Sequence, residues 1–309
     1  MSLTSLTHLS NFVRIAELQN LSKAAAVIRI AQPALSRQVR NLEAEVGGPL
    51  LVRHARGVSL TPAGEILLVH ARRMAREAEA ARDALQALSA EPTGRVALGV
   101  PVSLARALVP PLAETLARRY PRLRPHFVDG FSASLHGRML SGDLDLALLY
   151  EDRAMGPLTT APLLAENLVL VGPPDGGVAA PTTAAMLRGR HLILPARPNR
   201  LRLIVDEALT AIDEAAPVIM EVDSLPAIIG LVERGAGYAV LPYSAVAEEA
   251  SRAAISVSEL RFPQLSRTLL LAQPVQRQPT AAISAMEQEL RALVSTLAIS
   301  RRWDPLATP

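Results

Sequence analysis

The sequence changes character at residues 89–94, and this change constrains the fold more than any other feature. Before it, apolar residues recur every three or four positions, which is the spacing of amphipathic helices. After it, short apolar runs alternate with helical stretches, as in α/β folds. The segment SAEPTG contains Pro92 and Gly94 and interrupts any helix. Because 309 residues exceed the usual size of one hydrophobic core, we expect two or more folded units.

The first unit contains three short helical patterns, at residues 6–16, 24–28 and 35–46, and then two β-prone runs that predict a hairpin. Thr61 and Pro62 have the residue types of an N-cap and a first helical position. The long helix that follows has a heptad seam, which favours pairing with another helix. The seam comprises Leu67, Ala71, Met74, Ala78, Ala81, Leu85 and Leu88.

The stretch AQPALSRQVRNLE, at residues 31–43, predicts a helix with two unlike faces. Leu35, Val39 and Leu42 fall on one side, whereas the opposite side is polar and basic. Only residues 29–32 separate this helix from the preceding one, with Gln32 as the expected N-cap. This arrangement predicts a helix-turn-helix whose second helix enters the major groove of DNA. An ordinary amphipathic surface helix would have the same stripe.

The excess positive charge supports a polyanionic partner for the first unit. Residues 1–65 hold seven basic and four acidic side chains, and the remaining chain is balanced, for a net charge of +3. Ordinary variation in surface charge would give the same count. The sequence has no cysteine, which excludes disulfides, thiolate metal sites, cysteine nucleophiles and thiol redox sensing.

The second unit is predicted to be an α/β fold with mostly parallel, covered sheets. Strands are expected at residues 96–100, 125–129, 144–150, 168–172, 191–195, 218–222, 238–241 and 268–272, and helices at 103–119, 133–141, 201–215, 225–234 and 281–297.

Enzyme motifs are absent from the sequence. There is no G-x-S-x-G and no Walker A pattern. Gly235 and Gly237 supply only two glycines of a dinucleotide fingerprint, and they precede a strand instead of following one. The six histidines lack metal-ligand spacing. We therefore expect neither an enzyme nor a bound metal or cofactor.

No segment predicts export or membrane insertion. The N-terminal residues lack the basic start, apolar run and cleavage site of a secretory signal. No uncharged apolar run is long enough to span a bilayer. We expect a cytoplasmic protein with no membrane partner.

Longer motifs resemble a known family. SKAAAVIRIAQPALSRQVRNLEAEVGGPLLVRHARGVSLTPAG resembles the N-terminal domain of LysR-type bacterial transcriptional regulators. GDLDLALLY and LVERGAGYAVLP continue the resemblance into the second unit. LPARPNRLRLIVDEAL, preceded by LLAENLVLVGP, is most similar to the branch of nitrogen assimilation control proteins.

The resemblance implies a multidomain architecture. It places an all-α-type winged helix-turn-helix DNA-binding domain at residues 1–60 and a long linker (dimerisation) helix at 61–89. An effector-binding domain of the α/β, periplasmic-binding-protein-like type follows at 90–309. Its subdomain I would cover about 95–163 and 269–300, and its subdomain II about 164–268.

The resemblance also implies site residues. DNA-facing positions of the recognition helix would be Gln32, Pro33, Ser36 and Arg37, with Arg53 in the wing and with Arg40 and Arg56 contacting phosphates. The effector would be a small, anionic metabolite held where strand ends meet helix starts. Its site would include Pro101, Val102, Ser103, Phe131, Ser132, Ala196, Arg197 and Arg202. A role as a helix cap alone is an equal alternative for Ser103, and a solvated surface position is the alternative for Arg202.

These features predict a homodimer or homotetramer on an interrupted inverted-repeat promoter site. A small-molecule effector would modulate its contact with DNA and RNA polymerase. A DNA-binding regulator insensitive to any ligand would fit the sequence as well. A solute-binding protein or enzyme of the same two-lobed fold would explain residues 95–309 but not the first 94.

Overall fold

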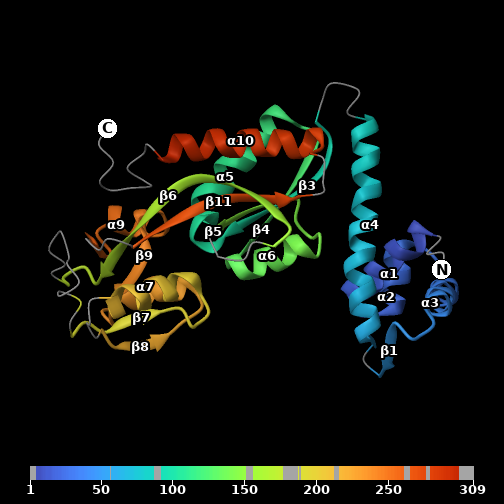
Figure 1. Cartoon of the computed structure of the whole chain (residues 1–309), viewed down its shortest axis with the longest axis horizontal. Helices are drawn as coiled ribbons and strands as arrows, with labels where there is room; N and C mark the ends of the chain where they lie inside the picture. The colour runs from blue at the N-terminus through green and yellow to red at the C-terminus, as the bar shows by residue number, and fades with distance from the viewer. Residues whose placement is uncertain are drawn as a thin grey trace. The chain divides into compact units, whose positions relative to one another are not determined.

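The computed structural model describes residues 5–55, 57–86, 92–150, 156–176, 187, 189–211, 216–260, 265–275 and 279–298. The chain divides near Glu91 and Pro92 into two compact units, an N-terminal unit and a C-terminal unit. Figure 1 shows helices and a small hairpin in the first unit, and a curled sheet with helices in the second. The predicted fold class is therefore confirmed.

The N-terminal unit has the predicted order of elements, and polar side chains set the helix starts. It comprises α1 (Leu6–Leu18), α2 (Leu21–Ile28), α3 (Gln32–Val46), β1 (Leu51–His54), β2 (Gly57–Leu60) and α4 (Pro62–Gln86). The side chains of Ser5, Asn20 and Thr61 accept hydrogen bonds from backbone N–H groups at the starts of α1, α2 and α4. α3 is different, because its N-cap is Ala31 and Gln32 is already helical. The expectation that Gln32 caps this helix was wrong by one position.

One apolar core holds α1, α2 and α3 together. Phe12 and Ile15 of α1 are fully buried, and so are Ala24 of α2 and Leu35 of α3. A small side chain at Ala24 allows the helices to approach closely. Backbone left-handed turns at Gln19 and Arg29 end the first two helices. The short connection after Arg29 thus fixes the orientation of α3.

Gly57 anchors the hairpin to α1. The N–H of the next residue, Val58, donates to the carbonyl of Gln19 at the end of α1. Gly57 has φ +142°, and a Cβ at this position would collide with the same carbonyl oxygen. Glycine is therefore required by both the backbone angle and the close approach.

The C-terminal unit contains two lobes connected by long strands. Its elements are β3 (Gly94–Pro101), α5 (Val102–Arg119), β4 (Leu123–Gly130), α6 (Ser132–Leu140), β5 (Leu146–Tyr150), β6 (Leu158–Gly172), β7 (Leu192–Leu194), α7 (Arg200–Ala211), β8 (Val218–Glu221), α8 (Leu225–Glu233), β9 (Ala239–Pro242), η2 (Tyr243–Ala245), α9 (Ala247–Ser251), β10 (Ser256–Glu259), β11 (Ser266–Pro274) and α10 (Ala281–Ala298).

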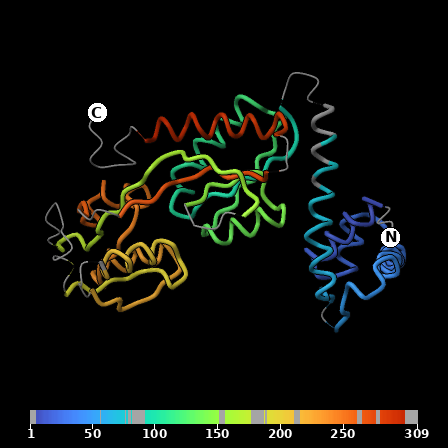
Figure 2. Tube along the Cα trace, viewed as in Figure 1, coloured from blue at the N-terminus to red at the C-terminus, as the bar shows by residue number. Residues whose placement is uncertain are grey.

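We expected mostly parallel sheets in this unit, and this expectation was wrong. β3 pairs with β4 and β5 in parallel, and β7 pairs with β8 in parallel. β6 and β11, however, pair with one another and with β5, β9 and β10 in antiparallel fashion. The reason is that β6 runs from the first lobe to the second while β11 returns alongside it, as Figure 2 shows.

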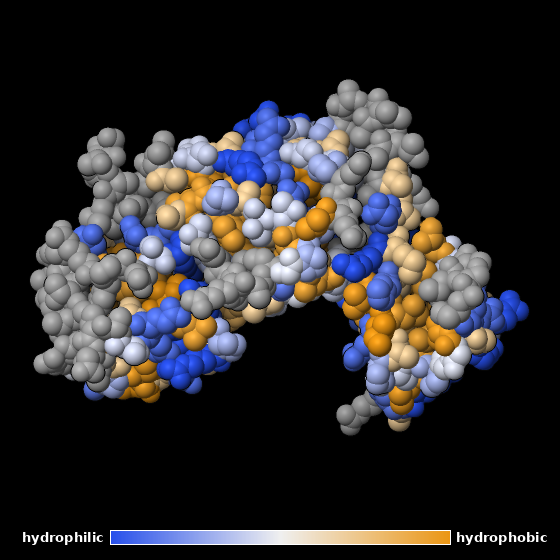
Figure 3. All heavy atoms as spheres, in the orientation of Figure 1, coloured by the Kyte–Doolittle hydropathy of each residue, from blue (hydrophilic) through white to orange (hydrophobic). Residues whose placement is uncertain are grey.

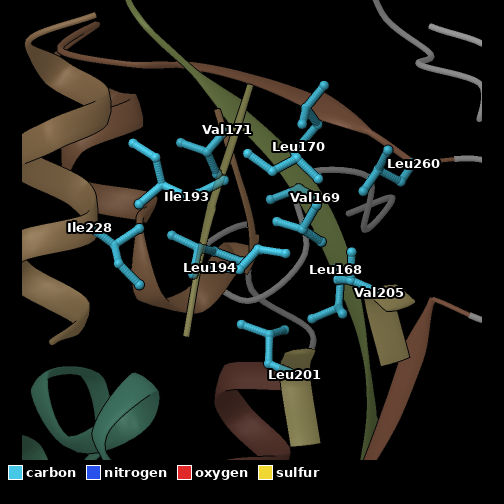
Figure 4. Packing of buried hydrophobic residues seen from close by; sticks show 14 of the residues in the cluster. Leu168, Val169, Leu170, Val171, Ile193, Leu194, Leu201, Val205, Ile228 and Leu260 are labelled. Carbon is cyan, nitrogen blue, oxygen red and sulfur yellow. The ribbon is translucent and has the colours of Figure 1, made fainter. Parts of the chain in front are cut away.

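Each lobe has its own apolar core. In the first lobe, Val96, Leu98 and Val100 of β3 pack with α5 and α10. The intervening Gly99 faces the opposite side, where a Cβ would lie 2.7 Å from Leu144 Cδ1 and 3.1 Å from Leu135 Cδ2. The second lobe packs the end of β6 against β7, α7 and α8, as Figure 4 shows. Among the described residues, no helix is long and apolar enough to cross a membrane.

Candidate functional site

The exposed face of α3 carries four of the five side chains predicted to contact DNA from this helix, and the fifth, Ser36, is buried. Gln32, Pro33, Arg37 and Arg40 are exposed, while Leu35 and the rest of the apolar stripe are buried. Asn11 Nδ2 of α1 donates to Gln38 Oε1 of α3 at 2.7 Å. This bond and the core hold α3 so that its polar face points outward.

The hairpin is bonded directly to α3. Arg53 Nη2 of β1 donates to Ser36 Oγ at 2.9 Å, and the serine is only 8 % exposed. Glu43 Oε1 accepts from the backbone N–H of Leu50 at 3.0 Å. Ser36 therefore positions the wing arginine, a role that the sequence did not indicate. Arg56 lies outside the described residues.

The predicted seam on α4 divides into two parts. Leu67 and Ala71 are buried in the core of the N-terminal unit, with Met74 packed against it. The sequence analysis expected these seam residues to contact a second copy of the chain. In the structure, α1 of the same chain covers this side of α4. Ala78 is half-buried and Ala81 is exposed. The side chain of Leu85, and Leu88 altogether, lie outside the described residues.

Apolar side chains remain exposed on the same unit. Ile66 of α4 is 65 % exposed and Leu6 of α1 is 50 % exposed. Figure 3 shows apolar surface over part of this unit. Large exposed aliphatic side chains on neighbouring helices are typical of a surface for association.

A cavity of about 380 Å³ lies between the two lobes of the C-terminal unit. It is bordered by the starts of α5, α6, α7 and α8, so the positive ends of four helix dipoles lie around it. Val102, Leu225, Ile228 and Leu241 supply apolar walls. The volume suits a small organic molecule.

Seven of the eight predicted effector-site residues line this cavity. They are Pro101, Val102, Ser103, Phe131, Ser132, Ala196 and Arg197. Arg202 does not line it, and neither expectation for its side chain was right. It is 7 % exposed and donates to Asp206 at 2.9 Å and to Glu221 at 2.7 Å. The pair with Asp206 lies within α7, and the pair with Glu221 secures α7 to β8.

The structure also brings together a polar cluster that the sequence analysis missed. We use the term floor cluster for Ser103, Tyr150, Glu166, Ser244 and Arg267. Arg267 Nη2 lies 2.8 Å from Glu166 Oε2, and the guanidinium carbon lies 3.4 Å from the centre of the Tyr150 ring. Tyr150 and Arg267 line the cavity. The available signal was a charged residue just before each of two predicted apolar strands, Glu166 before 168–172 and Arg267 before 268–272.

Burial changes the chemistry of this cluster. It raises the pKa of the Tyr150 phenol well above its usual value of 10.0, and the nearby Arg267 charge opposes this increase. The phenol is therefore protonated near neutral pH and donates to Glu166 Oε2 at 2.9 Å. Within the described chain, no group of three or more His, Asp or Glu side chains could hold a metal ion.

A winged helix-turn-helix followed by a two-lobed domain with an interlobe cavity defines a class of ligand-binding DNA-binding proteins. Comparisons with known proteins specify the family. Residues 6–65 match the family described as "Bacterial regulatory helix-turn-helix protein, lysR family", and residues 89–295 match "LysR substrate binding domain". The chain therefore belongs to the LysR family of transcriptional regulators.

Individual relatives cover nearly the whole chain. It is 33 % identical to the nitrogen assimilation regulatory protein nac of Klebsiella aerogenes, over 96 % of this chain and 98 % of that protein. A full-length OxyR variant from Pseudomonas aeruginosa has a TM-score of 0.74 and 26 % identity, covering 94 % of this chain and 97 % of its own. Full-length CbnR in complex with its target DNA has a TM-score of 0.69 and 19 % identity, covering 94 % and 100 %. The matched families are those of regulators and not of enzymes.

Proposed function

We propose that this LysR-type regulator acts in the cytoplasm as a homodimer or homotetramer on an interrupted inverted repeat in promoter DNA. A small-molecule effector in the interlobe cavity modulates its contact with RNA polymerase. The observation that carries this proposal is the outward polar face of α3, because its apolar face is locked in a core. A helix supported in this way can enter a major groove as a rigid element.

The start of α3 is suited to DNA. Ala31 offers no side-chain cap. Pro33 has no N–H and the Ala34 N–H donates to the Ala31 carbonyl, so a phosphate at this helix start would meet the N–H of Gln32. Gln32 and Arg37 are exposed and can reach base edges, whereas Arg40 lies one turn further along and suits a phosphate. Arg53 and Arg56 would contact the backbone or the adjacent minor groove. The CbnR neighbour has been solved in complex with its target DNA, which supports DNA binding by a chain of this fold.

Association through the N-terminal unit would supply two recognition helices. The exposed side of α4, from Ile66 to Ala81, and the neighbouring Leu6 of α1 are the candidate contact surface. A second copy would cover these apolar groups and present α3 twice, as a two-fold DNA site requires. Effector binding would then act by favouring one arrangement of the subunits over another.

Genomic fragment selection with the purified chain tests the proposal. The wild type should enrich an inverted repeat, and Arg37→Ala should weaken specific binding by about 1–3 kcal/mol if Arg37 contacts a base. Arg14→Ala is the matched control, because Arg14 is an exposed arginine of α1 paired with Glu17. It should retain enrichment.

Two outcomes would count against this assignment. An equal loss on random DNA would limit Arg37 to phosphate contact. A folded wild-type chain that enriches no sequence would overturn DNA recognition by α3.

A further inference from the structure

The floor cluster draws its side chains from five elements that meet at one end of the cavity. Ser103 lies in α5, Tyr150 in β5, Glu166 in β6, Ser244 in η2 and Arg267 in β11. The side chains of Glu166 and Arg267 are 1 % and 8 % exposed. Side chains that are this deeply buried require partners for their charges, so the direction of each hydrogen bond is informative.

Glu166 accepts every hydrogen bond that it makes in the cluster. Its Oε1 accepts from Ser244 Oγ at 2.6 Å. Its Oε2 accepts from Tyr150 Oη at 2.9 Å and from Arg267 Nε at 2.9 Å. The acceptors of Glu166 are thus occupied by groups of the protein itself. Its negative charge balances the guanidinium inside the protein.

The donors that remain belong to Arg267 and Ser103, and both residues line the cavity. Arg267 Nη2 donates to Ser103 Oγ at 3.2 Å, so the serine accepts there and its own proton is left for another acceptor. Tyr150 Oη, at 3.4 Å, can accept this proton, because the phenol donates its own to Glu166. A hydrogen bond of that length is weak, so a bound acceptor can replace it. Arg267 Nη1 has no partner in the part of the chain that the structure describes. This end of the cavity therefore offers donors and needs an acceptor.

We propose that the cavity selects a small molecule with one carboxylate-type head and an apolar body, and that Glu166 limits the head to a single negative charge. Arg267 Nη1 and the Ser103 hydroxyl hold the head, while Val102, Ile228 and Leu241 surround the body. All three arginines that line the cavity are already paired with carboxylates: Arg267 with Glu166, Arg197 with Asp206 and Arg200 with Glu207. Hydrogen-bond donors and helix N-termini therefore offset the single charge of the head, and no unpaired basic side chain of the described lining is left for a second charge. This inference rests on the proposed effector role of the cavity.

Calorimetric titration of the full-length chain with three probes of similar size tests the proposal. Hexanoate has one charged head, hexanamide has the same body without charge, and n-butylmalonate places two carboxylates on one carbon. The wild type should bind hexanoate at least tenfold more tightly than either other probe. Ser103→Ala should weaken hexanoate binding about tenfold, because one hydrogen bond to a charged group is lost.

Glu166→Gln tests the charge limit directly. The glutamine keeps the shape and an acceptor but removes the balancing charge, so binding of n-butylmalonate should strengthen at least tenfold relative to hexanoate. Glu289→Gln is the matched control: Glu289 is also buried and also bonded to an arginine and a tyrosine, Arg119 and Tyr120, away from the cavity. It should leave the order of the probes unchanged.

Several results would overturn the inference. These are equal binding of hexanoate and hexanamide, binding of neither carboxylate probe, or the wild-type order of probes in the Glu166→Gln variant. The same preparations are used for DNA fragment selection. Retained enrichment without discrimination among the probes would remove only the inference on the head group. Loss of enrichment in the wild type would count against the proposed DNA function alone.

Discussion

At the scale of single residues, local signals predicted the cavity wall well, but of the floor cluster they predicted only Ser103. Ser103 and Ser132 could be predicted because each follows a strand and begins a helix, and both facts are visible in nearby sequence. Arg267 and Glu166 lie 101 positions apart and meet only because β6 and β11 pair side by side. No local pattern contains that information, and the same applies to the bond between Arg53 and Ser36.

Gly57 gives a prediction at this scale. Gly57→Ala should destabilise the hairpin by about 1–3 kcal/mol, because an added Cβ meets the Gln19 carbonyl and φ is +142°. Hydrogen exchange of residues 51–60 measures the effect. Gly48→Ala is the control, since Gly48 has no atom within 4 Å of its Cβ position and no positive φ. Equal protection in the two variants would contradict the role given to Gly57.

At the scale of elements, regular patterns were predictable and crossing strands were not. The end of β6 is a continuous apolar run, and it was predicted as 168–172. The first part of β6 alternates irregularly between exposed and half-buried residues and contains Pro162, so its sequence has no strand period. β10 was not predicted because it has only four residues, SVSE, and three of them are polar. Both segments owe their conformation to pairing with other strands.

Ion pairs from Arg106 to Glu248 and Glu249 link elements of the two lobes. Arg106 of α5 donates to both carboxylate oxygens of Glu249 in α9, at 2.8 Å each, and to the Ala245 carbonyl at 3.1 Å. Such a two-point contact fixes direction as well as distance. We expect it to restrict the angle between the lobes.

Arg106→Gln should therefore broaden the distribution of distances between the lobes. Spin labels at Gly137→Cys on α6 and Ala227→Cys on α8, both exposed positions, can report this distance. The sequence has no native cysteine, so the labels attach only there. Arg291→Gln, which breaks an ion pair inside α10 alone, is the control. A distribution unchanged by Arg106→Gln would refute the restriction.

Lowering the pH should also broaden the distribution of distances between the lobes. The hydrogen bond from Arg106 lowers the pKa of Glu249 below its usual value of 4.5. The stabilisation is therefore present above that value and is lost as the pH falls through the lowered pKa. The wild-type distribution should broaden over that range, and the Arg106→Gln distribution should change less.

At the scale of the whole molecule, the order of the units was predictable because the helical and α/β patterns occupy separate parts of the chain. The surface through which copies of the chain associate was harder to predict. A heptad seam on α4 satisfies both packing within the chain and packing against another copy, and Leu67 and Ala71 serve the former. Only the three-dimensional structure identifies which apolar groups of α4 are left uncovered.

Ile66→Glu should lower the oligomeric state, because a charge would replace an aliphatic side chain that is 65 % exposed on α4. Light scattering of the DNA-free chain measures the mass. Val52→Glu is the control, since Val52 is 50 % exposed on β1 and outside the proposed contact surface. An unchanged mass for Ile66→Glu would exclude this side of α4 from the interface.

The paired strands β6 and β11 have a mechanical consequence. β6 and β11 are hydrogen-bonded to each other along the connection between the lobes. Paired strands bend or twist more readily than they slide past each other, so we expect the lobes to rotate about this connection. The floor cluster takes Glu166 from β6 and Arg267 from β11, so it lies on the connection itself. We expect a head group bound at the floor cluster to stay nearly still. The tail would reach parts of the cavity farther from the connection, where the lobes move most relative to each other. The length of the ligand's tail would therefore determine how far apart the two lobes are held.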